Sequence, residues 1–287
     1  MNDFLQTWQF AVPVALAAIG EAVGQKSGVI DIGLEGKMLA AAFAGAVVAI
    51  RTGSPALGLL AGLVVGIVLT LVQSLFVLRL AADQVVVGTA MNLLALGATG
   101  TLFRGMFGQS GQLITVPALH RMGGVDPVMV VTLFAAAILA WSLWRTGWGL
   151  VVRASGEYPK AADAEGYRVP RLRLGASLVS GALAGLGGAY LSIGLAGSFA
   201  ENMTAGRGFV AIALVTFGRW NPILIVVAAM LMGYLDVLQF RFQAQGSTVP
   251  FQLLLALPYL VALVVLVVAG RGSAAPEALG RPYRRAD

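Results

Sequence analysis

Residues 145–173 read RTGWGLVVRASGEYPKAADAEGYRVPRLR and form the longest charged stretch of a chain in which only 11% of residues are charged. Long apolar stretches flank this segment on both sides. A short basic loop between apolar segments lies on the cytoplasmic side of a membrane by the positive-inside rule. We therefore expect residues 145–173 to form a cytoplasmic loop. Residues 271–287, which carry several Arg residues after the last apolar run, are expected to form a cytoplasmic tail.

The composition indicates a membrane protein. Of 287 residues, 58% are hydrophobic, and the mean hydropathy is +0.85. About 20 apolar residues span a bilayer as a helix. Uncharged intervals near or above that length are residues 51–79, 83–104, 126–145, 173–201 and 241–271, and weaker candidates are residues 4–20, 38–50, 208–218 and 221–235. We predict an all-α transmembrane helix bundle of about eight to ten spans, with residues 1–287 as one domain.

The order of the apolar segments also predicts how the chain crosses the membrane. If the loop and the tail are both cytoplasmic, an even number of crossings separates them. Four crossings satisfy this condition if the short segment 209–217 crosses with assistance, and about five spans then precede the loop. Glycines spaced four apart, such as Gly181 and Gly185, predict helices that pack closely on one another.

Several classes of site are excluded or disfavoured. The chain has no cysteine, which excludes disulfides and thiolate metal sites. Its single histidine, His120, has no nearby acidic residues in the sequence, so no metal site is expected. The sequence pI is about 10.1, but the basic residues lie at span ends and in one loop. Orientation in a lipid membrane explains them, and no nucleic-acid partner is expected.

Residues 27–36, SGVIDIGLEG, interrupt the first apolar region with glycines and with two acids, Asp31 and Glu35. A glycine-punctuated break inside a membrane segment is typical of a discontinuous helix that lines a solute path. We therefore predict a broken helix near residues 27–36, with Asp31, Gly33 and Glu35 along the path. An ordinary polar loop with helix caps explains the pattern equally well.

Asn92 is a polar side chain in an otherwise apolar span, residues 85–103. Such a side chain is expected to face the interior of the bundle, and we assign it to the translocation path with the broken helix. The alternative is a hydrogen bond between helices that has no role in transport.

The middle of the charged loop predicts a short surface helix. Pro159 suits the first turn of a helix, residues 160–165 are compatible with helix, and Gly166 is a stop signal. A short exposed helix with small residues on one side is suited to a groove of a partner protein.

Five segments together carry a family resemblance: SGVIDIGLEGKML (27–39), ADQVVVGTAMNLLALG (82–97), VRASGEYPKAADAEGY (152–167), SGALAGLGGAY (180–190) and ENMTAGRGFVAIAL (201–214). They resemble the membrane permeases of bacterial ABC importers, in the branched-chain amino acid, simple sugar and nucleoside group. The first and last of these segments are most similar to nucleoside and simple-sugar permeases. The resemblance covers about residues 20–270.

The resemblance implies a transport subunit and not an enzyme. Such a permease lies in the bacterial inner membrane, pairs with a second and often different permease, and accepts nucleosides or simple sugars from an extracytoplasmic solute-binding protein. Separate cytoplasmic ATPase subunits bind ATP and Mg²⁺, so the chain itself is expected to bind no cofactor. Consistent with this, the sequence has no nucleotide-binding signature.

The resemblance also assigns the charged loop a role in coupling to the ATPase. Its matching residues are Glu157, Ala161, Ala162 and Gly166. The competing hypothesis, an ion-coupled secondary transporter, is kept open by Asp31 and Glu35. Such a transporter is expected to show an internal repeat, and the sequence shows no clear repeat between its halves.

Overall fold

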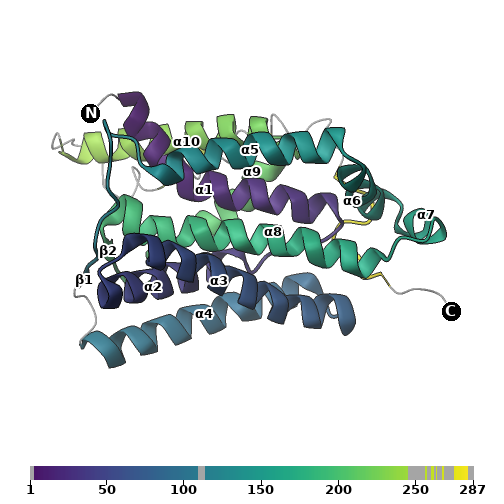
Figure 1. The fold of residues 1–287 in the computed structure, drawn as a ribbon, viewed down its shortest axis with the longest axis horizontal. Helices are drawn as coiled ribbons and strands as arrows, with labels where there is room; N and C mark the ends of the chain where they lie inside the picture. Colours follow the sequence, from purple (N-terminus) through teal and green to yellow (C-terminus); the bar gives the residue numbers. More distant parts are fainter. Residues whose placement is uncertain are drawn as a thin grey trace.

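The structure is a computed structural model that describes residues 3–108, 114–244 and 275–283, with a few isolated helical positions between 256 and 267. Its helices lie along one long axis (Figure 1). They are α1 (Asp3–Lys26), α2 (Leu34–Thr52), α3 (Pro55–Ser74), α4 (Gln84–Phe107), α5 (Pro127–Arg145), α6 (Gly147–Glu157), α7 (Pro159–Ala164), α8 (Val169–Tyr190), α9 (Arg207–Phe217) and α10 (Pro222–Ala244). Beyond residue 244, the last uncharged interval, residues 241–271, lies almost wholly outside the described residues.

Short irregular elements extend or connect these helices. The π-helical turns η1 (Leu75–Arg79) and η2 (Leu191–Ala196) prolong α3 and α8. The strands β1 (Ile114–Thr115) and β2 (Ser198–Phe199) pair in antiparallel orientation at one end of the bundle (Figure 1).

Polar residues at the turns set where the spans begin. Asp83 Oδ1 accepts hydrogen bonds from the first backbone N–H groups of α4, and Asp126 Oδ1 does the same for α5. Ser54 caps α3, and proline occupies the first turn of both α3 and α5. These side chains satisfy N–H groups that would otherwise have no partner within the helix.

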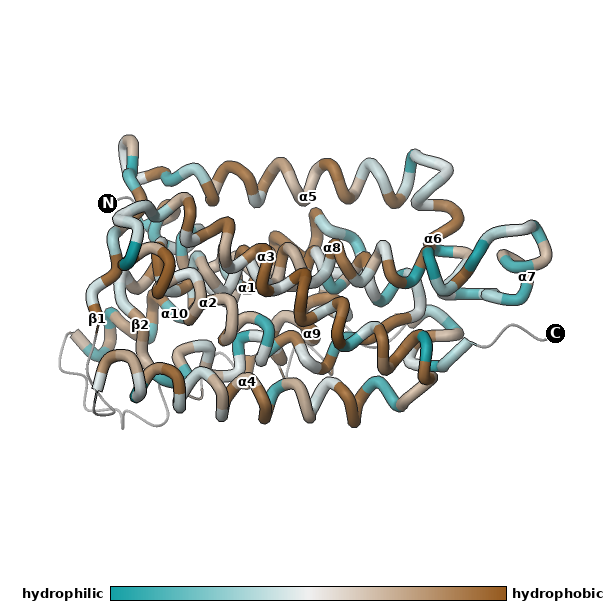
Figure 2. The backbone as a smooth tube through the Cα atoms, turned by 60° about the horizontal axis from the view of Figure 1, so that its bottom comes forward, coloured by the Kyte–Doolittle hydropathy of each residue, from teal (hydrophilic) through white to brown (hydrophobic). Residues whose placement is uncertain are grey.

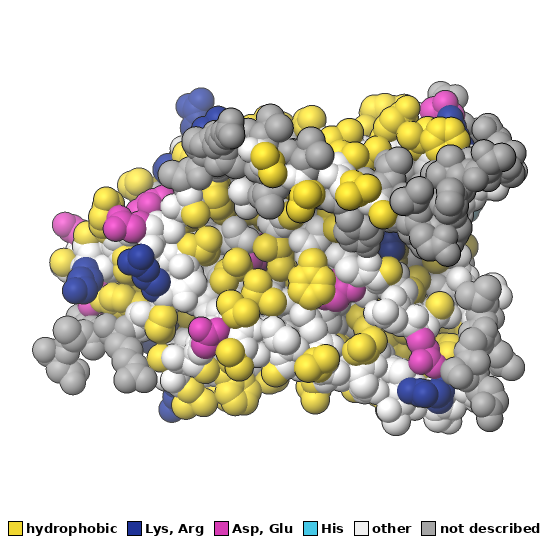
Figure 3. Space-filling view, turned by 180° about the vertical axis from the view of Figure 1, so that it is seen from behind, with side chains coloured by type: hydrophobic (Ala, Val, Ile, Leu, Met, Phe, Trp, Pro, Cys, Tyr) yellow, Lys and Arg dark blue, Asp and Glu magenta, His cyan; other side chains and the backbone are white. Residues whose placement is uncertain are grey.

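The prediction of an all-α membrane bundle is confirmed. Among the residues that the structure describes, six helices are long and apolar enough to cross a membrane: α1, α3 with η1, α4, α5, α8 with η2, and α10. Large apolar side chains such as Leu93 and Phe134 are 66% and 64% exposed. Apolar side chains cover the middle of the visible face, whereas charged ones lie mainly toward its ends (Figure 3). This distribution suits contact with lipid.

Glycines let the central helices approach closely, as their spacing predicts. A Cβ atom at Gly66 of α3 would lie 2.8 Å from Gly185 Cα of α8. One at Gly20 of α1 would lie 3.1 Å from Ser180 Cα of α8. Larger residues would force these backbones apart, so the small side chains hold α8 between α1 and α3.

Two helices, α2 and α9, begin inside the bundle. The first break, residues 27–33, leads from the end of α1 back to the middle of the bundle, where α2 starts (Figure 1). The second break, residues 197–206, precedes α9. Glu35 in the first turn of α2 accepts hydrogen bonds from Gly206 and Gly208 at the start of α9. The N-terminal ends of α2 and α9 therefore meet inside the protein.

The two halves of the chain repeat one arrangement in inverted orientation. In each half, a long helix (α1 or α8) is followed by a break, a helix that begins inside the bundle (α2 or α9) and another long helix (α3 or α10). α1 packs antiparallel to α8 and α10, and α8 packs antiparallel to α1 and α3. This repeat was not found from the sequence.

The charged loop and the described part of the tail lie at the same end of the bundle. Figure 2 shows α6 and α7 as a largely hydrophilic projection beyond the apolar helices. Residues 275–283 contact this projection, since the Ala278 N–H donates to the Gly156 carbonyl over 2.9 Å. This placement is consistent with a loop and a tail on the same side of the membrane. That this side is the cytoplasmic one remains a prediction.

Candidate functional site

The first break is the structural centre of the candidate site. α1 ends at Lys26 and α2 begins at Leu34, so the chain is broken where the sequence predicts. The predicted range of 27–36 is slightly too long, because residues 34–36 already belong to α2. Gly28 has a φ of +96°, and a Cβ atom there would lie 2.7 Å from Arg173 Nη2. Glycine is required at this turn for both reasons.

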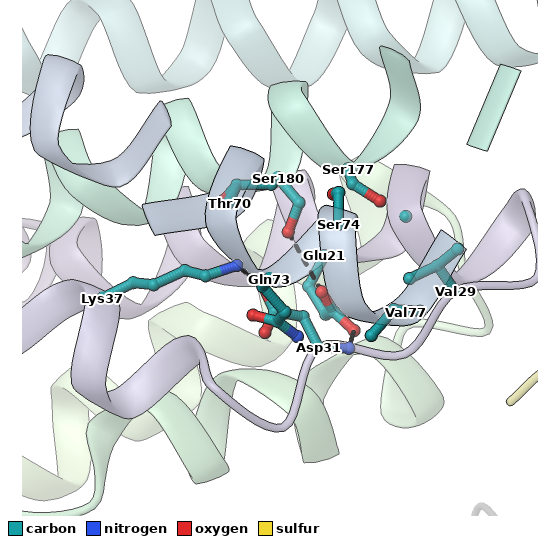
Figure 4. A pocket seen from close by; sticks show the side chains of 11 residues that line it. Glu21, Val29, Asp31, Lys37, Thr70, Gln73, Ser74, Val77, Ser177 and Ser180 are labelled. Carbon is teal, nitrogen blue, oxygen red and sulfur yellow. Dashed lines mark hydrogen bonds and ion pairs between the residues drawn. The ribbon is translucent and has the colours of Figure 1, made fainter. Parts of the chain in front are cut away.

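Asp31 lies in a buried polar cluster and is paired with Lys37. The two side chains form a salt bridge, and the residues are 5% and 1% exposed. Glu21 of α1, fully buried, accepts a hydrogen bond from the Asp31 N–H over 2.9 Å and another from Ser180 Oγ over 3.0 Å. Figure 4 shows these side chains converging on the break. Charged groups persist in such surroundings only when paired and hydrogen-bonded.

The cavity beside this cluster is small. Its volume is about 10 Å³, which corresponds to roughly one water molecule. A Cβ atom at Gly33 would lie 3.0 Å from Gln73 Oε1 and 3.3 Å from Met91 Cβ. The surroundings of Asp31 and Gly33 within this chain are therefore tightly packed, and their assignment to a solute path stays a prediction.

Asn92 of α4 bonds to the end of the break and to the first turn of α2. Its Oδ1 accepts from the Gly36 N–H and its Nδ2 donates to the Ile32 carbonyl, each over 2.8 Å. Gln84, at the start of α4, accepts from the Ile30 N–H over 2.8 Å. Asn92 thus makes the hydrogen bonds between segments that the alternative interpretation expects. A transport role for it is untested.

Glu35 caps the N-terminus of α9. Its two carboxylate oxygens accept from the Gly206 N–H over 2.8 Å and from the Gly208 N–H over 2.6 Å. A carboxylate at this position also interacts favourably with the positive end of the helix dipole. Glu35 is 8% exposed, so it joins the two halves of the protein from the interior.

The charged loop is more structured than the sequence predicts. The expected surface helix is α7, and Gly166 ends it with a φ of +89°. Residues 147–157 form a further helix, α6, which the sequence analysis missed. Thr146 caps α6, and Val152 and Ser155 are fully buried. The segment therefore contains two helices, of which α6 packs against α1 and α8.

The four predicted coupling residues differ in exposure. Ala161 and Gly166 are exposed, whereas Ala162 is only 4% exposed and faces its own chain. Glu157 is half-buried, and its Oε2 accepts from the Glu277 N–H of the tail over 3.3 Å. Within this chain, then, Ala161 and Gly166 are open to a partner and Ala162 supports the loop.

The buried cluster contains residues that the sequence analysis did not assign to a site, namely Lys37, Gln73 and Gln84. Lys37 follows Glu35 by two positions within the quoted motif, but its pairing with Asp31 depends on how the break folds. Gln73 and Gln84 lie at the ends of other helices. Polar residues are common near the ends of membrane spans, so the presence of these two glutamines did not predict that they contact the break.

Comparison with known proteins identifies the fold and its role. Residues 4–270 match the family described as branched-chain amino acid transport system / permease component. The chain belongs to this family. It is a multi-pass membrane permease subunit and not an enzyme. No solved structure matches the chain significantly.

Curated relatives cover nearly the whole chain. It is 32% identical to the guanosine ABC transporter permease protein NupQ of Bacillus subtilis, over 96% of this chain and 94% of the relative. It is 30% identical to the nucleoside ABC transporter permease protein NupC of Lactococcus lactis, with the same coverage. It is 34% identical to the putative glucose ABC transporter permease protein TsgC13 of Haloferax volcanii, over 83% of this chain and 77% of the relative.

Each of these three organisms has a second similar permease. These are NupP of B. subtilis and NupB of L. lactis, both 25% identical to this chain, and TsgB13 of H. volcanii, 27% identical. In every pair the chain is more similar to one member than to the other.

Proposed function

We propose that this chain is the membrane subunit of an ATP-driven importer whose solute is a nucleoside. The observation that carries the proposal is the similarity, over 96% of the chain, to permeases named for guanosine and nucleosides. A simple sugar is the second candidate, supported by the 34% identity to a putative glucose permease. The importer lies in the bacterial inner membrane and receives solute from an extracytoplasmic binding protein.

A second, different permease completes the membrane core. Support comes from the paired permeases of three organisms, because the chain is consistently closer to one member of each pair. Cytoplasmic ATPase subunits bind ATP and Mg²⁺ and contact α7. Exposure of Ala161 and Gly166 supports this contact. The solute path opens as the transporter changes between inward-facing and outward-facing states. It is bordered by Asp31, Gly33, Glu35 and Asn92.

The ion-coupled alternative loses its main support. Asp31 is neutralised by Lys37, and both oxygens of Glu35 are bound by N–H groups of α9. Both carboxylate oxygens of Glu35 are thus occupied in this conformation, and the charge of Asp31 is already balanced by Lys37. The structure does contain the internal repeat that this alternative expects, so the importer hypothesis rests on family membership and not on the lack of a repeat.

Uptake by the reconstituted complex tests the function. Liposomes containing the permease, its second permease and the ATPase, together with the binding protein, are expected to accumulate labelled guanosine only when ATP is enclosed. Labelled glucose in a parallel assay separates the two solute classes. Uptake that persists without ATP and collapses with an ionophore would show an ion-coupled transporter instead.

A matched pair of variants tests the coupling contact. Ala161→Arg places a charge on the exposed face of α7 and is expected to abolish ATPase copurification, because burial of an unpaired charge in a docking groove is costly. Lys160→Ala, at the exposed neighbouring position, serves as the control. Normal copurification and uptake by Ala161→Arg would remove α7 from the contact.

A further inference from the structure

The described tail residues, 275–283, are bound to two separate parts of the protein, and we name them the strap. The Ala278 N–H donates to the Gly156 carbonyl at the end of α6 over 2.9 Å. The Gly280 N–H donates to the Gly28 carbonyl in the first break over 3.1 Å. Ala278 is only 7% exposed. The strap is therefore packed against the bundle, although it is more than 100 residues from either partner in the chain.

Arg173, near the start of α8, fixes the strap from inside. Its Nη1 donates to the Arg281 carbonyl over 2.8 Å, and its Nη2 donates to the Ser155 carbonyl of α6 over 3.4 Å. Arg173 is 1% exposed, and its guanidinium also lies against Gly28. One buried side chain thus contacts α6, the strap and the first break.

α6 also touches the first break directly. Ser155 Oγ donates to the Ser27 carbonyl over 3.1 Å, and a Cβ atom at Gly156 would lie 3.1 Å from the Gly28 nitrogen. Together these contacts form a junction of α6, the break, α8 and the strap. If α6 moves, either the first break moves with it or several hydrogen bonds are lost.

We propose that the strap is a positioning element that transmits movement of the α6–α7 loop to the first break. The proposal rests on the proposed function, in which α7 meets the ATPase. A cleft of about 540 Å³ separates α7 from the strap, with Tyr158 and Ala161 on one side and Pro282 on the other. α7 is therefore free to take up a partner, while α6 and the strap stay fixed to the break.

Two truncations test the proposal in the complete transporter. Ending the chain after residue 274 removes the strap, whereas ending it after residue 283 retains the strap and removes only the last residues. Solute uptake per inserted permease and ATP hydrolysed per solute are measured in liposomes. The shorter chain is expected to lose about tenfold in uptake, because several hydrogen bonds at the junction are lost. ATP hydrolysis continues, so more ATP is consumed per solute.

Point variants keep the test valid if the truncated chain fails to insert. Gly280→Pro removes the N–H that donates to Gly28, and proline cannot adopt the φ of +74° at this position, so the variant detaches the strap and is expected to raise the ATP consumed per solute molecule. Glu277→Ala keeps its backbone N–H and alters only an exposed side chain, so it should match the wild type.

An unchanged ratio of ATP to solute in both the strap deletion and Gly280→Pro would overturn the proposal. Loss of ATPase copurification would also overturn it, since the strap would then belong to the docking surface. Failure of the proposed function has a different signature, because the wild-type complex itself would show no ATP-dependent uptake.

Discussion

The two breaks have equivalent places in the inverted repeat but are held in different ways. The first break lies among buried polar side chains from three other helices, including Glu21, Ser180 and Asn92. The second is capped by Glu35, bonded by Arg207 and paired with β1 through β2, and it contains two non-glycine residues with positive φ, Asn202 at +57° and Ala205 at +46°. Positive φ is unfavourable for alanine. The first break is thus fixed by its surroundings, whereas the second stores backbone strain.

The largest expected effect follows from separating the buried ion pair of the first break. Lys37→Met leaves Asp31 charged and unpaired, and we expect it to destabilise the protein by about 3–5 kcal/mol. Combining it with Asp31→Asn should recover a large part of that loss, because no unpaired charge remains. Thermal unfolding of the purified variants in detergent measures both effects. Equal stability of the single and double variants would show that the pair does not hold the break.

Removing the carboxylate that joins the two breaks should have the next largest effect. Glu35→Ala removes the carboxylate that caps the N-terminus of α9, and loss of such a cap costs about 0.5–2 kcal/mol. Glu35→Gln retains one acceptor oxygen and should be less destabilising. Thermal unfolding provides the comparison, together with uptake per inserted permease. If Glu35→Ala unfolds like the wild type, the start of α9 does not need this contact.

A smaller effect is expected at the ion pair beside the second break. Arg207 and Asp236 lie 3.7 Å apart with side chains 22% and 21% exposed. Partly exposed pairs contribute about 0–1 kcal/mol, so Arg207→Gln should shift the unfolding temperature far less than Lys37→Met. A loss as large as that of Lys37→Met would mean that the second break is fixed as firmly as the first.

The smallest expected effect is a gain in stability. Ala205→Gly relieves the positive φ of the second break, an unfavourable conformation by about 1–2 kcal/mol for alanine. Glycine loses about 0.5–1 kcal/mol in conformational entropy on folding. The net stabilisation is therefore about 0.5 kcal/mol. Ala95→Gly, inside α4, is a control that should destabilise instead. If Ala205→Gly is less stable than the wild type, the positive φ of Ala205 is not a source of strain.

Local signals in the sequence were sufficient to place the helices. Uncharged intervals gave the long spans, Pro159 and Gly166 bounded α7, and glycines around Asp31 marked the first break. Each of these patterns involves only a few neighbouring residues, so it can be recognised in the sequence without knowledge of the fold.

Contacts between distant residues were not predictable in the same way. Glu35 and Gly206 are 171 positions apart, and the burial of Ala162 depends on how α7 packs. The inverted repeat is hidden because its equivalent segments share few residues. The start of α2 carries the acidic Glu35, whereas the start of α9 carries the basic Arg207.

The cap that Glu35 places on α9 also bears on solute selectivity. In many transporters the positive ends of interrupted helices face the anionic group of the solute. Here the protein's own carboxylate already occupies that end of α9. A phosphorylated solute reaching this region would meet a negative charge instead of open N–H groups. If Glu35 borders the solute path, as we propose, the arrangement favours uncharged molecules over their phosphate esters.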